Sequence, residues 1–279
     1  MRGKAGDAVR PGGQALADGV LMRTKLAWAI ARADGSVETG AMARTPLGKV
    51  PGLRVLAGLA GGLRLGVGRG FFQGRAHRGN RRFLIVLAAT EVVALGLLFG
   101  LGPVAQDLSA PAASAVSLVA GAVALAIVRR AAPASLWRYH GAEHKAAASF
   151  EAGADPTDVD AAMTMTRLHP RCGTNLLVPL AVVGIALSGL SSAAQLLGGV
   201  ASLAFVAEAL TLAARSRRSL WARALLAPGL FLQRYVTTAE PTREEQAVAC
   251  NAMAACLEAH ARVLEPAALS AVPLVPAAV

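Results

Sequence analysis

Charged side chains and aromatic rings are scarce in this chain of 279 residues, at 16% and 4% of the sequence. Soluble domains carry about 25% charged residues, so the composition argues against an ordinary soluble globular protein. Lysine and arginine are absent altogether from residues 83–128 and 173–214. The stretches that lack them are rich in Ala, Leu, Val and Gly, a mixture typical of helices that pack closely within a membrane.

Cysteine is also rare. The chain has three, Cys172, Cys250 and Cys256, and an odd number without regular spacing excludes a disulfide framework. Thiols that face the cytosol are expected to stay reduced. No secretory signal is evident, because the N-terminal region is polar and the first long apolar run begins near residue 83.

Basic residues are in excess, with a formal net charge of +11, and they gather on either side of the apolar stretches. Such a charge suits nucleic acid or an anionic membrane surface. No aromatic-rich basic motif of an RNA- or DNA-binding module accompanies it. We therefore expect the lipid bilayer, and not nucleic acid, as the partner.

The apolar stretches predict the fold class. Four segments are apolar over the roughly 17–25 residues that a bilayer crossing needs, at residues 83–102, 112–128, 173–190 and 193–214. Connections without Lys and Arg face outward, so both termini and the loop at residues 129–172 face the cytoplasm. We predict a mainly α, polytopic membrane protein: a four-span helical bundle with a small cytoplasmic β-hairpin element and amphipathic surface helices.

Three regions follow from this interpretation. Residues 1–50 form a cytoplasmic region with a β-hairpin around an Asp-Gly turn. Residues 51–240 form the membrane domain, in which residues 51–74, interrupted by arginines, fit an interfacial or re-entrant helix better than a fifth span. Residues 220–236 are expected along the membrane surface or docked on the bundle. Residues 241–279 form a cytoplasmic helix that starts with a Thr-Arg-Glu-Glu capping box, followed by a disordered tail.

The strongest functional signal is the segment Tyr139-His140-Gly141-Ala142-Glu143-His144-Lys145. His140 and His144 are four residues apart, so on a helix they project from one face and are able to chelate a transition metal. With Glu143 the spacing is H-x-x-E-H, that of inverted zincins, in which the glutamate is the general base for a zinc-bound water. The alternative is a pair of surface histidines on a helix that leaves the membrane.

A second segment, His169-Pro170-Arg171-Cys172-Gly173-Thr174, adds further candidates. His169 and Cys172 carry ligand types that zinc prefers, and Arg171 is placed to favour the thiolate of Cys172. Glu208 lies in the last apolar stretch, where a carboxylate is costly and is a functional candidate by default. For the segment from His169 to Thr174, the alternative is a helix-start turn at the lipid headgroups. We predict a metal site of His140, His144 and His169, completed by Cys172 or Glu208.

Both segments closely resemble the signature of the YqhQ-like family of bacterial membrane proteins, an uncharacterised group described as predicted metal-dependent enzymes. The resemblance covers most of residues 12–250 and includes the motifs Gly12-Gly13-Gln14-Ala15 and Pro228-Gly229. It implies a bacterial cytoplasmic (inner) membrane protein and supplies no substrate. It also implies a functional centre of His140, Glu143, His144, His169, Arg171 and Cys172, with Gln14, Arg23 and Glu208 as further contributors.

The function predicted is that of a metal-dependent integral membrane protein, with zinc as the first candidate for the divalent transition metal. It would hydrolyse a lipid-linked or membrane-embedded substrate at the cytoplasmic face, with Glu143 and Arg171 as catalytic residues. The alternative is a non-catalytic scaffold or partner-binding protein with a structural metal or a hydrogen-bonded His/Cys cluster. A transporter, suggested by Glu91 and Glu208, is a third class. A closed four-ligand site would favour a structural role, whereas three ligands plus water would favour catalysis.

Overall fold

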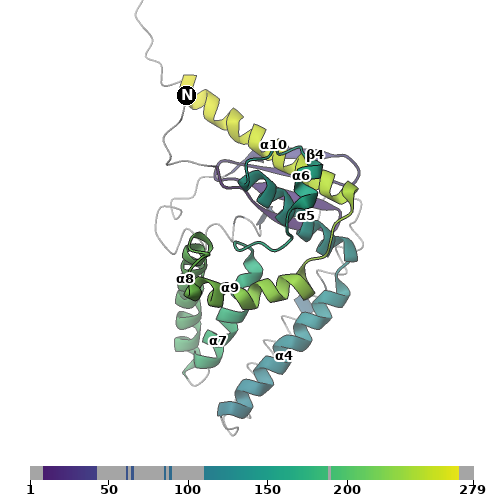
Figure 1. Ribbon diagram of the computed structural model, residues 1–279. Coiled ribbons are helices and arrows are strands. Elements are labelled where there is room, and N and C mark those ends of the chain that lie inside the picture. The colour runs from purple at the N-terminus through teal and green to yellow at the C-terminus, as the bar shows by residue number, and fades with distance from the viewer. Residues whose placement is uncertain are drawn as a thin grey trace, which may run out of the picture.

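The computed structural model describes residues 9–42, 110–187 and 190–269, and isolated helical positions at 61, 64, 65, 85, 88 and 89. The strands are β1 (Gly12–Leu16), β2 (Gly19–Arg23), β3 (Ala27–Arg32) and β4 (Val37–Ala41). The helical elements are α4 (Ala110–Ala131), α5 (Ala134–Glu151), α6 (Val159–Thr164), the 3-10 helix η3 (Gly173–Leu176), α7 (Leu177–Leu187), α8 (Ser192–Arg215), α9 (Leu220–Leu232), the π-helix η4 (Gln233–Thr237) and α10 (Arg243–Leu269) (Figure 1).

The four strands form an antiparallel sheet in the order β1-β2-β3-β4. The turn between β3 and β4 contains Gly35 at a φ of 85°, a conformation that favours glycine. The expected Asp-Gly hairpin therefore corresponds to half of a larger sheet. Side chains alternate between its faces, so that paired Leu21 and Ile30 point to one side and paired Met22 and Ala29 to the other.

Helices cover both faces of this sheet. One face packs against α5 and α10 in a cluster that includes Val20, Met22, Ala29, Tyr139, Ala142, Ala146, Met253 and Cys256. The other face packs against the end of α4 and the start of α5, where Trp28 and Ile30 meet Leu136 and Trp137. The helix that carries the H-x-x-E-H segment is therefore fixed against the sheet along much of its length.

The start of α10 has the capping box that its sequence predicts. The Glu245 N–H donates to Thr242 Oγ1 at 3.2 Å, and the Thr242 N–H donates to Glu245 Oε2 at 2.9 Å. Arg138 Nε also donates to Glu245 Oε1, at 2.8 Å. The first turn of α10 is thus tied to α5.

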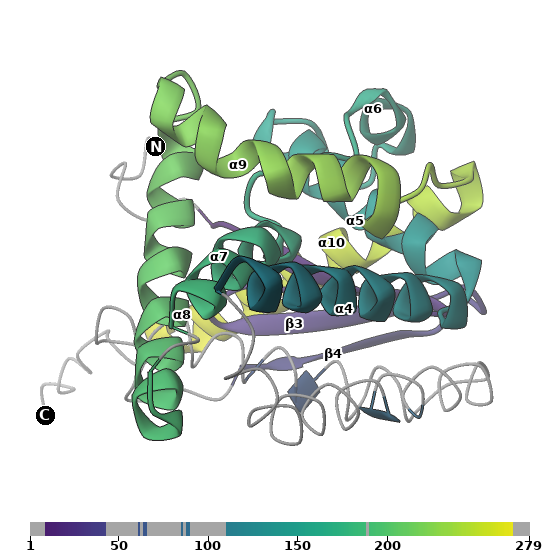
Figure 2. The same cartoon turned by 90° about the horizontal axis from the view of Figure 1, so that it is seen from below.

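A second layer, built from α7, α8 and α9, packs around Val206, Leu210, Ala213, Ala222 and Leu226. Figure 1 shows α4, α7 and α8 extending from one side of the sheet, with α9 crossing near one end of α8, and Figure 2 shows these helices from below. Their outward surfaces are apolar. The exposed large apolar residues on α4, α7 and α8 include Val119, Val123, Val182, Leu196, Leu197 and Phe205.

The predicted four-span helical bundle is wrong. In the described parts of the chain one helix, Ala193–Arg215, is long and apolar enough to cross a membrane. A second candidate arises only if Leu118–Ala131 and Ala134–Glu151, bent by 98°, count as one broken span. In place of a third span, the described residues 173–187 form η3 and the 11-residue α7. This helix is roughly 16 Å long, against a hydrocarbon core of roughly 30 Å.

The predicted loop at residues 129–172 contains α5 and α6, and α5 belongs to the core. Hydropathy alone marked residues 173–190 as a span, but it does not show where an α-helix begins, and the 3-10 helix η3 occupies the first four of these residues. The predicted span at 112–128 falls within α4, and α9 with η4 covers residues 220–236. The predicted interfacial helix at 51–74 and the span at 83–102 lie outside the continuously described residues, as does the tail beyond residue 269.

Gly141 allows α5 to approach the segment that precedes α10. A Cβ added at Gly141 would lie 2.1 Å from the carbonyl oxygen of Ala239. That segment is itself held to α5, because the Ala239 N–H donates to Trp137 O at 2.8 Å. Neither backbone is therefore free to move away from the added methyl group.

We expect Gly141→Ala to destabilise the protein by about 2–3 kcal/mol through overpacking, although glycine to alanine within a helix normally stabilises by about 1 kcal/mol. Thermal unfolding of the purified chain measures the change. Gly121→Ala is the matched control, since a Cβ at Gly121 of α4 meets nothing within 4 Å. Equal unfolding temperatures for the two variants would contradict the close contact.

Candidate metal centre

His140 and His144 project from the same face of α5, and a backbone carbonyl fixes each ring. His140 Nδ1 lies 2.6 Å from Thr237 O, and His144 Nδ1 lies 2.6 Å from Arg167 O. A carbonyl oxygen only accepts hydrogen bonds, so each Nδ1 carries a proton and donates it. The Nε2 atom of each neutral ring is then left with a lone pair, the arrangement that metal-binding histidines have.

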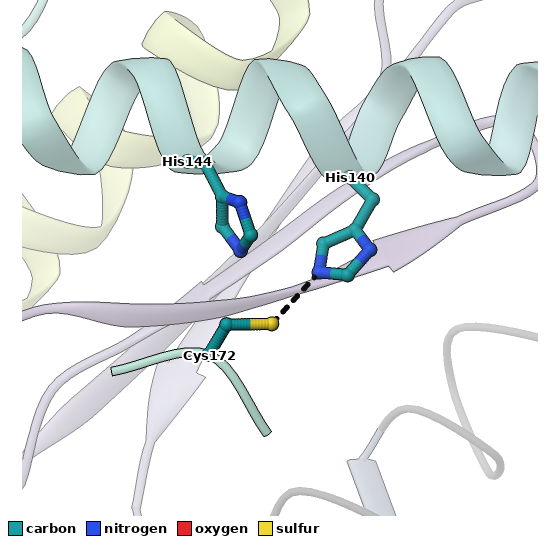
Figure 3. Close-up of side chains that lie close together, drawn as sticks. All are labelled: His140, His144 and Cys172. Carbon is teal, nitrogen blue, oxygen red and sulfur yellow. Dashed lines mark hydrogen bonds between the residues drawn. The ribbon is translucent and has the colours of Figure 1, made fainter. Parts of the chain in front are cut away.

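Cys172 directly precedes η3, and its side chain faces these two rings (Figure 3). Its Sγ lies 3.3 Å from His140 Nε2 and accepts a hydrogen bond from the Thr174 N–H at 3.4 Å. One ligand atom from each of His140, His144 and Cys172 lies within 4.8 Å of the others. Ligands around a tetrahedral zinc ion are roughly 3.4–3.8 Å apart, so small side-chain adjustments would suffice to hold the ion.

Glu143 lies beside this cluster, with its side chain buried. Glu143 Oε2 is 3.5 Å from His144 Nε2, and 7% of the residue is exposed. Its side chain packs against Gly13 of β1, where an added Cβ would lie 2.5 Å from Glu143 Cγ. The glycine in β1 therefore provides the space in which this carboxylate reaches the histidines.

His169 is adjacent to the cluster but bonded elsewhere. Its ring centroid lies 5.6 Å from that of His144, and the three-residue cluster does not include it. His169 Nδ1 accepts from the Arg171 N–H at 3.4 Å. His169 Nε2 is buried and lies 3.4 Å from Glu151 Oε1. The structure thus groups three residues with side chains of the ligand type, and His169 lies next to them.

Arg171 pairs with Glu151 instead of facing the thiol of Cys172. Glu151 also lies 3.7 Å from Arg217 Nη2. The pKa of the Glu151 carboxyl is below its ordinary value, because His169 first, and Arg171 and Arg217 in addition, stabilise the charged form. Glu151 is therefore a carboxylate that holds two arginines and a histidine at the edge of the cluster.

The other sequence candidates lie farther away. Glu208 is on α8, in a groove with Phe205 and Arg215, and is not part of the described His/Cys cluster. Cys250 and Cys256 are buried in the core between α10 and the sheet. Burial raises the pKa of both thiols, that of Cys256 to about 12, so neither thiol has the character of a ligand or nucleophile.

Sequence reasoning missed several residues that organise this site. Glu151 follows His144 by seven residues and so shares its face of α5, a spacing that would have identified it. Thr237 and Arg167 act through backbone carbonyls, for which no side-chain signal exists. Gln233 is fully buried and bonds to the backbone of His169. Its role depends on the fold and leaves no trace in local spacing.

Comparisons with known proteins give one match. No curated protein and no solved structure matches the chain. A family described as a protein of unknown function, DUF1385, matches residues 81–259, a stretch that includes His140, Glu143, His144 and Cys172. Since this match spans more than half of the sequence, the chain belongs to the DUF1385 family of proteins of unknown function.

Proposed function

We propose that this protein is a metal-dependent enzyme, with zinc as the metal, that hydrolyses a substrate at the cytoplasmic face of a bacterial inner membrane. The observation that carries the proposal is the pairing of both Nδ1–H groups with backbone carbonyls, which directs the Nε2 atoms of His140 and His144 toward Cys172 Sγ. Two imidazoles and a thiolate form a ligand set that zinc prefers. The resemblance to the YqhQ-like family adds support.

The number of ligands favours catalysis over a structural role. His140, His144 and Cys172 would hold the ion, while His169 is engaged by the Arg171 N–H and lies against Glu151. Three protein ligands leave a position for water, and zinc bound there would lower the pKa of that water to about 7. Glu143, buried beside His144 Nε2, would accept the proton as general base.

The location at a membrane is supported by the exposed apolar surfaces of α4, α7 and α8. Contiguous apolar surface of this kind marks a membrane or protein contact. Basic residues gather where these helices end, with Arg129 and Arg130 at the end of α4 and Arg215 at the end of α8. Lys and Arg mark the cytoplasmic side of membrane segments. A lipid-linked molecule or a membrane-embedded peptide is then the class of substrate that reaches the site.

A second candidate is a non-catalytic scaffold stapled by a hydrogen-bonded cluster without metal. The 3.3 Å contact between Cys172 Sγ and His140 Nε2, and that between Sγ and Thr174 Oγ1, favour it. In this case the thiol donates to the ring, and no ion is required. Elemental analysis of the full chain purified without chelators separates the two, because the absence of stoichiometric metal would leave only the scaffold.

We expect Glu143→Gln to retain the metal and to lower hydrolysis by about 10²–10⁴-fold, because the amide is no longer a base. The measurement incubates the full chain with bacterial membrane lipids and membrane peptides and follows products by mass spectrometry, alongside metal content. Glu258→Gln, on the exposed face of α10 with 73% of its side chain accessible, is the control that should keep both properties. Full activity in Glu143→Gln would rule out the assigned base.

A further inference from the structure

The turn between α8 and α9 is a strongly basic surface outside the candidate metal centre. Arg215, Arg217 and Arg218 are exposed there, around an open depression of about 530 Å³ that Ser216 and Ser219 also line. From residue 209 to residue 239 the chain contains five arginines and no acidic residue. A depression with this charge fits an anion, and arginine pairs with phosphate through two parallel N–H groups.

An apolar groove adjoins this depression. It measures about 400 Å³ and is lined by Phe205, Glu208, Ala209, Thr211, Leu212 and Arg215. Arg215 belongs to both hollows, so the charged and the apolar surface are continuous. Phe205 is 76% exposed, and Trp221, just beyond the turn, is 47% exposed. Tryptophan at such a boundary is typical of the interface between lipid headgroups and hydrocarbon.

We propose that this surface binds a phosphate-bearing lipid, with the phosphate at Arg215 and Arg218 and the hydrocarbon chain along Phe205 and Leu212. Charge complementarity selects the headgroup, and the groove selects an amphiphile over a free anion. A neutral lipid would offer Arg215 and Arg218 no negative charge, and inorganic phosphate would leave the apolar groove open to water.

The same surface leads to the candidate metal centre. Arg217 Nη2 lies 3.7 Å from Glu151 Oε2, and the other oxygen of Glu151 pairs with Arg171, which precedes Cys172. Through Glu151, the α8–α9 turn that would hold the lipid phosphate is linked to the residue next to Cys172. This step rests on the proposed function, and it names a lipid phosphate as the substrate class of that site.

Trp221 provides a direct probe. Trp28 and Trp137 are buried, so quenching by lipids with brominated chains reports mainly on Trp221, and Trp221→Phe gives the background. The full chain in nonionic detergent is titrated with brominated phosphatidylglycerol and, separately, with brominated phosphatidylcholine. We expect half-maximal quenching at about a 25-fold lower mole fraction of phosphatidylglycerol, since each of the two arginines near an anionic lipid contributes about fivefold.

Arg215→Gln with Arg218→Gln should remove this preference and keep the metal content. Arg243→Gln with Arg262→Gln, the same change in charge at exposed positions of α10, should keep the preference. Equal quenching by the two lipids would overturn the proposal. So would a preference for phosphatidylglycerol that persists in the Arg215→Gln, Arg218→Gln variant. So would full displacement of the lipid by equimolar inorganic phosphate, which would indicate a site for a free anion.

Metal content and lipid preference are measured separately, so a failure of the proposed function is distinguishable from a failure of the proposed lipid site. His144→Ala is expected to keep the preference for phosphatidylglycerol while it loses metal. A wild-type protein that prefers this lipid but carries no metal would support the lipid site and contradict the proposed hydrolase.

Discussion

Replacement of His144 by alanine is expected to lower metal affinity by at least about 100-fold and to leave the purified protein without stoichiometric metal. Loss of a group that only orients a ligand costs about 10–100-fold, and loss of the ligand itself costs more. His144 is 2% exposed, and its Nδ1–H bonds to Arg167 O at 2.6 Å, so its ring is fixed before any ion binds. Elemental analysis, with competition against a chromophoric chelator, measures the loss.

His260→Ala is the matched control for this substitution. His260 is half-buried, and its Nδ1 lies 2.8 Å from Thr24 Oγ1, on the side of the sheet that α10 covers. The variant removes an imidazole without touching the cluster, so we expect metal content to be unchanged. If His144→Ala keeps its metal, or if both variants lose it equally, the ligands assigned to α5 are wrong.

The fold was predicted only in part, because local sequence patterns are reliable for turns and caps but not for the contacts of apolar residues. The Asp-Gly turn and the capping box at Thr242 depend on residues close in sequence, and both are present. The four-span bundle depended on hydropathy, which does not say what an apolar residue contacts. Ala142 and Ala146 of α5 pack on the sheet, whereas Leu196 and Leu197 of α8 are exposed.

The candidate site shows the same limit. Helical spacing identified His140 and His144 as neighbours on one face, and the structure places them so. The residue that completes the site was left open between Cys172 and Glu208, and Cys172 is the residue that faces the two rings. His169 was expected as a ligand, but the backbone around Arg171 and the carboxylate of Glu151 engage its ring. Which partner engages the His169 ring depends on three-dimensional distances, and these cannot be read from the sequence.

Gln233 connects the two segments on which the site depends. Its Oε1 accepts from the His169 N–H at 2.7 Å, while its Nε2 donates to His169 O and to Asn175 Oδ1, both at 3.0 Å. It is fully buried in the π-helix η4, which also supplies the Thr237 carbonyl that fixes His140. π-Helices occur often at functional sites. One amide therefore aligns the loop of Cys172 with His140 on α5.

We expect Gln233→Leu to destabilise the protein by about 3 kcal/mol, since it leaves buried polar groups of His169 and Asn175 without partners at about 1–3 kcal/mol each. Metal affinity should fall by about 10–100-fold, as for loss of a group that orients ligands. Thermal unfolding and chelator competition measure the two effects. If the variant does not fold, Gln233→Glu is the second variant: it retains the shape and the acceptor for the His169 N–H, and it places an acceptor oxygen opposite His169 O and Asn175 Oδ1 in place of the donor.

Gln246→Leu separates alignment of the ligands from a general loss of stability. Gln246 is also fully buried, but its Nε2 donates to Ala142 O at 3.2 Å, and its Oε1 has no hydrogen-bond partner among the described residues. Its removal should lower stability and leave metal affinity nearly unchanged, because neither the Cys172 loop nor η4 is involved. An equal loss of affinity in both variants would mean that overall stability, and not the amide of Gln233, sets the geometry of the site.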